Sequence, residues 1–543
     1  MYLIINYLAS VLIVGFFYLS GVNFSKLFIN NTKKAKEKLI DIENLYVFLG
    51  FFWYGNILIL INYFLPTKYF LFIFFFYLIF FERNEIKNIY RSNKFTLLSL
   101  LFLIHSIFNN NPSQDSKIYH FYVQNMISSQ KISFGLTNFD PLYGLTSIFD
   151  YVASSFWIGN NYGFIQILNL VVLSSFFNFL YINLKTNKKI LTQFSLIVII
   201  AGLMDNVGFG GGRNGFLFIQ EIGKFDNVYS VIFLISTIIF LVIISENGRD
   251  PTNVYLILYF ITFLSQLRSM GYLYFIFLFI YLFLAKVRLK VSSYFGFVFL
   301  NLIWVLKNFI TSSCFLYPLN FTCMPFVDWY WPNQASYLTR RAFTNNRNPN
   351  EVIMDFKNFD WVSDYWINEN LSYLLNFILT FCVIRLLVQI LKVEKNQLKN
   401  SSQKLIGSCL ISYFIIWFFM YPNYRFVSGV IMSIYVIFNL NYSLNLNFPK
   451  FSYITIGLLI IANIFLVRID SYFSFYSNPS IEINEKFIVN EPTLVKRNNS
   501  FGFKSTSIYC YTFLECSNSN QNTNIKLINS YLFYIPINVD LYK

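Results

Sequence analysis

Charged residues are scarce in this chain of 543 residues, and their scarcity excludes an ordinary soluble protein. Asp, Glu, Lys and Arg together make up 12% of the sequence, whereas 56% of the residues are hydrophobic. The core of a soluble protein does not need that much apolar and aromatic surface. Several apolar runs approach the ~20 residues with which a helix crosses a bilayer. The sequence therefore predicts an all-α polytopic membrane protein.

Several motifs are also missing. With two histidines and six cysteines, the chain has no CxxC or His-rich spacing typical of zinc sites. The glycine-rich stretch GFGGGRNG, at 208–215, lacks the Lys-Ser/Thr pair of a nucleotide-binding P-loop. No sequence repeat is evident, which disfavours a transporter built from duplicated halves. Cys314 with Cys323, and Cys510 with Cys516, form close pairs, which we expect to be disulfides if their segments are extracytoplasmic.

The net charge of +15 does not indicate nucleic-acid binding, because Lys and Arg cluster in short segments between the apolar runs. Cytoplasmic loops have this distribution under the positive-inside rule.

No basic segment precedes the first apolar run and no small-residue cleavage site follows it, so we expect that this run is retained as a helix. We expect about fourteen spans, some shorter than the ideal length. They lie near 3–21, 45–65, 67–82, 95–108, 161–181, 190–204, 227–245, 253–267, 272–285, 291–310, 371–391, 405–421, 427–444 and 452–468.

These spans divide the chain into two predicted parts. Residues 1–468 form the multi-span domain. The polar, Asn- and Ser-rich residues 469–543 form a small extracytoplasmic cap with β or α/β structure, since TNIKLINSYLFYI alternates as strands do. If the spans alternate across the membrane, both termini and four other segments lie on the outer side. These segments are 109–159, 205–226, 311–369 and 421–426.

The first long outer loop carries ionisable residues at the membrane face. Asp115 follows an apolar run, and the apolar residues after it recur at helical spacing. This pattern predicts an amphipathic helix along the membrane surface, with His120 on it. The segment FDPLYGLTSIFDY, which contains Asp140, then returns to the apolar region.

This layout resembles the GT-C superfamily of membrane glycosyltransferases, which use sugars carried on polyprenyl phosphate. In that superfamily the first external loop has an acidic residue, followed further along by a Pro-Leu-Tyr type motif. The matching residues here are Asp115 and then Pro141, Leu142 and Tyr143. The chain departs from the pattern at Ser116, where a second acid often stands, and in having a single proline.

A closer resemblance is to uncharacterised bacterial GT-C-type polytopic proteins associated with surface polysaccharides. Their YDxxxYH pattern corresponds to Gln114, Asp115, Tyr119 and His120. Their KNxIxSGxxLYP segment is matched by LKNFITSSCFLYPL at 306–319, and their PDPRF segment by YPNYRF at 421–426. The resemblance implies a multi-pass protein of the bacterial cytoplasmic membrane, with its active site on the extracytoplasmic face.

Transfer of a sugar from a lipid phosphate needs a base for the acceptor hydroxyl and positive charge for the departing phosphate. Asp115 is the expected base. His120 and Asp140 would orient the acceptor or a divalent cation, Mg or Mn, for which Asp115 is a candidate ligand. The expected partners are a polyprenyl-phosphate sugar donor, a glycan or lipid-linked acceptor and the bilayer, without nucleic acid. The residues expected to bind substrate are Arg425, Arg268, Arg213, Asp226, Tyr119 and Tyr143.

Each of these residues also has a structural interpretation. Asp115 could cap a helix, and Asp140 before proline is a turn signal. His120 could be a structural hydrogen-bond partner, and Arg425 could reach lipid headgroups.

Two other functions of the protein stay open. A non-enzymatic transporter or flippase of lipid-linked sugars would place charges deep inside its spans. A polysaccharide polymerase would depend less on Asp115 than on Arg340, Arg341 and Arg347.

Overall fold

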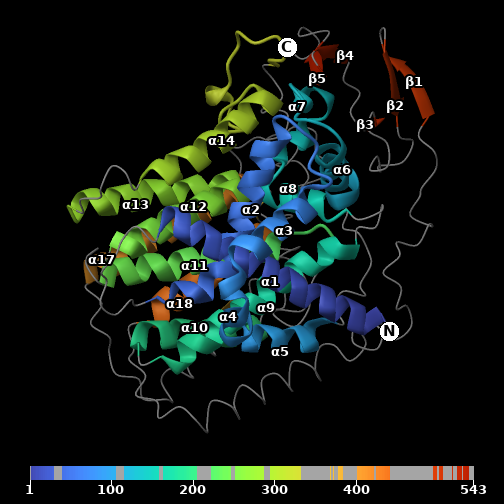
Figure 1. The fold of residues 1–543 in the computed structure, drawn as a ribbon. Coiled ribbons are helices and arrows are strands. Elements are labelled where there is room, and N and C mark those ends of the chain that lie inside the picture. Colours follow the sequence, from blue (N-terminus) through green and yellow to red (C-terminus); the bar gives the residue numbers. More distant parts are fainter. Residues whose placement is uncertain are drawn as a thin grey trace.

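A bundle of long helices forms most of the structure, with two small β-sheets at one end of it (Figure 1). The structure is a computed structural model. Outside the range 362–384, in which only single residues are described, it describes residues 2–29, 40–104, 115–157, 163–186, 188–204, 222–245, 251–286, 294–331, 400–420, 424–440, 493–497, 500–504, 516–517, 523–528 and 530–536.

The helices of the bundle coincide with most of the predicted spans. Within the described ranges, five helical segments are long and apolar enough to cross a membrane, and six apolar helices are shorter. The helical membrane class is thus supported by length and composition, whereas the count of about fourteen spans stays a prediction. The helices are α1 (Tyr2–Phe28), α2 (Tyr46–Asn62), α3 (Phe70–Phe81), α4 (Ile86–Ser92), α5 (Lys94–Leu103), α9 (Gly163–Lys185), α10 (Lys189–Met204), α11 (Asp226–Ser245), α12 (Pro251–Leu267), α13 (Tyr272–Leu284), α14 (Phe295–Ser312), α17 (Asn400–Met420) and α18 (Ser428–Asn439).

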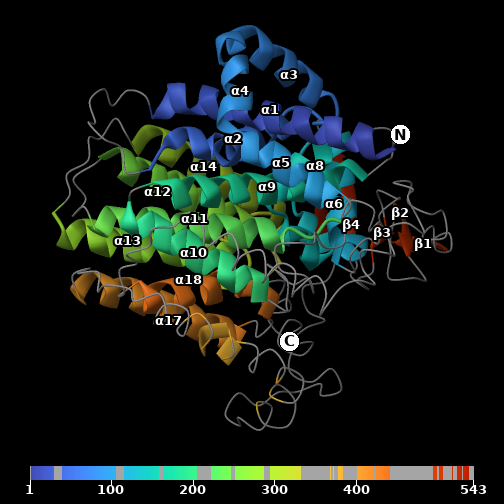
Figure 2. The same cartoon turned by 90° about the horizontal axis from the view of Figure 1, so that it is seen from below.

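Helix α11 lies at the centre of the bundle, where it packs against α9, α12 and α18 (Figure 2). Its residues from Asp226 to Ile244 are all buried, as expected for a helix that is apolar on every side. Helices α1 and α2 approach each other closely because glycines lie at their contact. A Cβ atom on Gly21 would lie 1.9 Å from the Tyr46 carbonyl oxygen, and one on Gly50 would lie 1.8 Å from that of Phe17. Only glycine fits there.

Short helices of the first loop lie at one end of the bundle. They are a π-helix, η4 (Ser116–His120), and then α6 (Phe121–Ser129), α7 (Leu136–Phe139), the 3-10 helix η5 (Pro141–Leu145) and α8 (Ile148–Ser155). The predicted helix after Asp115 is therefore present. Its polar residues Gln124 and Ser128 are buried like its apolar ones, so other parts of the protein surround it.

The alternating C-terminal segment forms the predicted strands. Strands β4 (Thr523–Ile528) and β5 (Tyr531–Pro536) pair as an antiparallel hairpin. The hairpin extends onto the first loop, because Phe134 N donates to Leu532 O at 2.8 Å and Tyr534 N donates to Phe134 O at 2.9 Å. The other sheet contains β1 (Thr493–Arg497), antiparallel to β2 (Ser500–Lys504), and β3 (Cys516–Ser517), parallel to β2.

Candidate functional site

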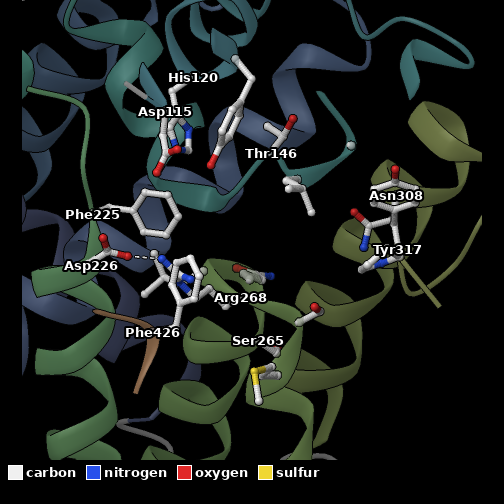
Figure 3. Close-up of a pocket in the computed structure, with 18 of the residues that line it drawn as sticks. Asp115, His120, Thr146, Phe225, Asp226, Ser265, Arg268, Asn308, Tyr317 and Phe426 are labelled. Carbon is white, nitrogen blue, oxygen red and sulfur yellow. Dashed lines mark hydrogen bonds and ion pairs between the residues drawn. The ribbon is translucent and has the colours of Figure 1, made fainter. Parts of the chain in front are cut away.

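A cavity of about 170 Å³ lies where the first loop meets the ends of the central helices (Figure 3). Each of the four segments predicted to share one side supplies lining residues, among them Asp115, Asp226, Tyr317 and Phe426 from the first to the fourth. The break between α12 and α13 contributes Arg268. Segments far apart in the sequence thus converge on one pocket, the place at which a ligand site is expected in a helical protein.

One wall of the pocket, the His120–Asp150 wall, is a buried hydrogen-bonded network. His120 Nδ1 lies 2.8 Å from Asp150 Oδ1, and Gln124 Nε2 donates to the same oxygen at 2.9 Å. The other oxygen, Oδ2, accepts from Ser147 N and Ser147 Oγ, each at 2.8 Å. Trp157 Nε1 holds the Gln124 carbonyl oxygen at 3.1 Å. Four donors therefore surround one buried carboxylate.

The protonation of this network follows from its surroundings. Burial by itself would raise the pKa of the Asp150 carboxyl, but the electrostatic attraction to the His120 ring and the hydrogen bonds to the carboxylate outweigh burial, so the pKa is lowered. An ionised carboxylate only accepts hydrogen bonds, so His120 Nδ1 carries the proton that it shares with Asp150. Asp150 engages Nδ1, so Nε2 is the ring nitrogen that His120 can present to the pocket that it lines.

The opposite wall, the Asp226–Arg268 wall, is built around one guanidinium group. Arg268 donates from a terminal nitrogen to Asp226 Oδ1. Its guanidinium carbon lies 4.1 Å from the centroid of the Phe426 ring and 5.4 Å from those of Phe225 and Tyr229. These aromatic faces attract and orient the cation. The Arg268 side chain is 22% exposed, and its Nε is buried with no hydrogen-bond partner in the described part of the chain.

Five of the predicted site residues line the pocket: Asp115, Tyr119, His120, Asp226 and Arg268. In Figure 3, Asp115 and His120 lie together on the side opposite Arg268. The Asp115 side chain makes no helix-capping hydrogen bond, so the capping interpretation of this residue finds no support. The pairing of Arg268 with Asp226 was not predicted, although both residues were.

Asp140 and Tyr143 have other surroundings. The Asp140 side chain accepts a hydrogen bond from Leu142 N at 3.0 Å and caps η5, as its turn interpretation predicts. Tyr143 is fully buried and stacks on Tyr122, with ring centroids 4.4 Å apart. Neither belongs to the pocket lining, which includes the neighbouring Gly144.

Other predicted residues cannot be placed. Arg213 lies outside the described residues, as do the three arginines of the polymerase hypothesis, and nothing is described of the Arg425 side chain.

The predicted disulfide between Cys314 and Cys323 is present. Within the described ranges, no three or more His, Cys, Asp or Glu residues gather as ligands for a metal ion.

Sequence reasoning missed Asp150, although a local signal was available. Ser147 and Asp150 form a capping box at the start of α8, and the Ser-x-x-Asp spacing before an apolar run is the signature of that motif. The partnership with His120 has no such local signal, because the two residues are 30 positions apart.

Lys307 lies in the last part of α14. It is fully buried, and its Nζ donates to Thr146 O at 3.0 Å and to Asn308 Oδ1 at 3.1 Å. Tyr317 Oη donates to Pro141 O at 2.8 Å. These contacts join the LKNFITSSCFLYPL segment to the Pro-Leu-Tyr segment beside the pocket.

Searches among curated proteins and solved structures found no match to the chain. A protein family provides the one positive comparison, and it spans every residue that lines the pocket while ending before the C-terminal hairpin. Residues 1–432 match the family described as Domain of unknown function (DUF8201), and since this match covers more than half of the chain, the chain belongs to that family.

Proposed function

We propose that the chain is an integral-membrane glycosyltransferase. It would move a sugar from a polyprenyl-phosphate carrier to a lipid-linked or surface glycan, on the outer face of a bacterial cytoplasmic membrane. One observation carries the proposal: a carboxylate, Asp115, and an imidazole, His120, line the same pocket as the cation Arg268. These are the groups that such a transfer needs, and the resemblance to GT-C enzymes names the same acid.

The chemistry assigns a role to each side of the pocket. The acceptor oxygen forms a bond to the anomeric carbon of the sugar, and the bond from that carbon to the phosphate oxygen breaks with its electron pair. Asp115 takes the proton that the acceptor hydroxyl loses. Arg268 stabilises the negative charge of the departing phosphate by charge-assisted hydrogen bonds. The rings of Tyr119 and Phe426, which line the pocket, suit the apolar faces of sugars.

The position of the pocket suits a donor that is anchored in lipid. Helix α11 begins at Asp226 and α12 ends at Leu267, and both of these residues line the pocket. The pocket therefore lies at the ends of apolar helices, which is the depth of lipid headgroups and of a carrier phosphate.

The distribution of ion pairs favours an enzyme over a transporter of lipid-linked sugars. In the described part of the chain, Lys26 pairs with Glu82 and Arg268 with Asp226, and all four residues lie at helix ends. The His120–Asp150 pair lies in the first loop. A transporter is expected to hold charges deep within its spans.

The test is a complementation experiment in a strain of the source organism that lacks the gene. Wild type, Asp115→Asn and Asp328→Asn are returned, and the surface glycan is compared by mass. Asp328 is an exposed aspartate on the same predicted side and is the matched control. We expect wild type and Asp328→Asn to restore a missing sugar, and Asp115→Asn, at equal protein level, to lower the transfer rate by roughly 10²-fold or more.

Two outcomes would contradict the proposal. Full restoration by Asp115→Asn would remove the catalytic role of Asp115. A mutant that makes complete but unpolymerised glycan units, rescued by Asp115→Asn and not by a variant lacking Arg340, Arg341 and Arg347, would indicate a polymerase.

A further inference from the structure

We propose that Asp150 is a positioning residue, which fixes the tautomer of His120 so that Nε2 accepts a hydrogen bond in the pocket. The ligand group would be a hydroxyl of the sugar acceptor. This assignment rests on the proposed glycosyl transfer for the identity of the ligand, but the pairing itself rests on the geometry of the first loop.

Asp150 is built to hold a neighbour and not to touch a substrate. Its carboxylate is fully buried, and each of its oxygens already accepts two hydrogen bonds. A ligand in the pocket therefore reaches His120 and not Asp150, which does not line the pocket. The effect of Asp150 on the reaction passes through the imidazole ring.

The surrounding elements leave the imidazole little freedom. Asp150 is held by the capping box at the start of α8, and His120 ends the π-helix η4. The His120 ring lies 4.0 Å from the Tyr119 ring and meets the edge of Phe225 at 5.3 Å, measured between centroids. A ring held on both sides, with Nδ1 bound to a carboxylate, presents one defined atom to the pocket.

This arrangement makes Asp150→Asn an informative substitution. An asparagine has one oxygen. We expect this oxygen at the Oδ2 position, where it keeps the capping box with Ser147, while Gln124 Nε2 loses its acceptor at the Oδ1 position. The amide NH₂ then faces His120, so Nδ1 must accept a hydrogen bond and the ring proton moves to Nε2. The substitution keeps the shape of the side chain but changes the pocket-facing atom of His120 from an acceptor to a donor.

The chain contains only two histidines, so one further substitution isolates the signal. His105→Gln leaves His120 as the single imidazole. The full chain is labelled with ¹⁵N-histidine and purified into lipid nanodiscs. The ¹⁵N NMR chemical shifts of the imidazole ring are recorded at a pH above the titration range of imidazole. We expect protonated Nδ1 and unprotonated Nε2 in His105→Gln. Adding Asp150→Asn should reverse the two and lower sugar transfer by roughly 10²-fold or more.

Ser147→Ala is the matched control, because it removes one donor to Asp150 but leaves the carboxylate. It should keep the Nδ1-protonated tautomer. Three results overturn the proposal: a His105→Gln spectrum with protonated Nε2, an Asp150→Asn spectrum with unchanged tautomer, or normal transfer by Asp150→Asn. The first requires no variant at Asp150, so it decides the question even if that variant does not fold.

The spectra also separate this inference from the proposed function. If wild type transfers no sugar, the glycosyltransferase proposal fails, whereas the spectra still decide whether Asp150 sets the tautomer of His120. If wild type transfers sugar and the tautomer is the reverse one, only the role of Asp150 fails.

Discussion

The two walls of the pocket are built in opposite ways. In the His120–Asp150 wall the carboxylate is fully buried and has four donors from the protein. In the Asp226–Arg268 wall the Arg268 side chain is 22% exposed, and its guanidinium lies against aromatic rings, with Nε lacking a hydrogen-bond partner among the described residues. Breaking the hydrogen bonds of the first wall would leave buried polar groups without partners. In the second wall, Arg268 can change its hydrogen-bond partner at a lower cost in free energy. The comparison indicates that the first wall orients a ligand and the second binds its charge.

The largest effect is expected in the stability of the buried wall. Asp150→Ala removes the acceptor of four hydrogen bonds and leaves His120, Gln124 and Ser147 donors buried, so the free energy of unfolding should fall by about 3–5 kcal/mol. Asp226→Ala should lower it by less, because the Arg268 side chain that it leaves without this partner is 22% exposed. Thermal and denaturant unfolding of the purified chain in detergent measures both. Equal losses would mean that the two walls do not differ in this way.

Substitutions in the Asp226–Arg268 wall should mainly change ligand binding. Arg268→Gln removes the charge beside the pocket, and we expect the KM for the lipid-phosphate donor to rise about 10- to 100-fold. Arg268→Lys should recover only part of the loss, because an ammonium lacks the planar fork of the guanidinium. Initial rates at varied donor concentration separate KM from kcat. An unchanged KM in Arg268→Gln would remove the donor-binding role.

Acid should weaken the buried wall through Asp150. Its pKa in the folded state is lowered, because the electrostatic attraction to the His120 ring and the hydrogen bonds to the carboxylate outweigh its burial. A lowered carboxyl pKa stabilises the fold above the unfolded-state pKa of about 3.9, and this contribution is lost as the pH falls through the folded-state pKa. Wild type should therefore lose more stability than Asp150→Asn on acidification below about pH 4. Unfolding curves at several pH values measure this, and parallel losses would contradict it.

The smallest effect on stability is expected where the C-terminal hairpin contacts the end of α2. Tyr531 Oη donates to Tyr63 O at 2.9 Å, between the C-terminal hairpin and the end of α2. Tyr531→Phe should lower the free energy of unfolding by about 1 kcal/mol or less. The exposed Tyr69 provides the control substitution, Tyr69→Phe. Hydrogen exchange around Phe134 gives a local readout, and a large loss of activity would show that the hairpin does more than support the loop.

Much of the candidate site was accessible from residue types and their order. Asp115, Tyr119 and His120 were chosen from a motif in the first loop, and Asp226 and Arg268 because they are charged residues near the outer ends of spans. Asp140 was also chosen from the motif in the first loop, yet its side chain caps η5. An acidic residue beside a proline has the same local sequence whether it faces a pocket or a backbone amide, so sequence alone does not separate the two.

The sequence alone indicated the membrane character, and it predicted the position of most helices and the strands of the hairpin. These properties depend on composition and periodicity within one continuous segment, such as the apolar run that forms α11. Tertiary packing alone pairs His120 with Asp150, and Arg268 at the end of α12 with Asp226 at the start of the neighbouring α11. Such pairs depend on how helices from distant segments pack, and a few kcal/mol of packing and hydrogen bonding select one arrangement without leaving a local pattern in the chain.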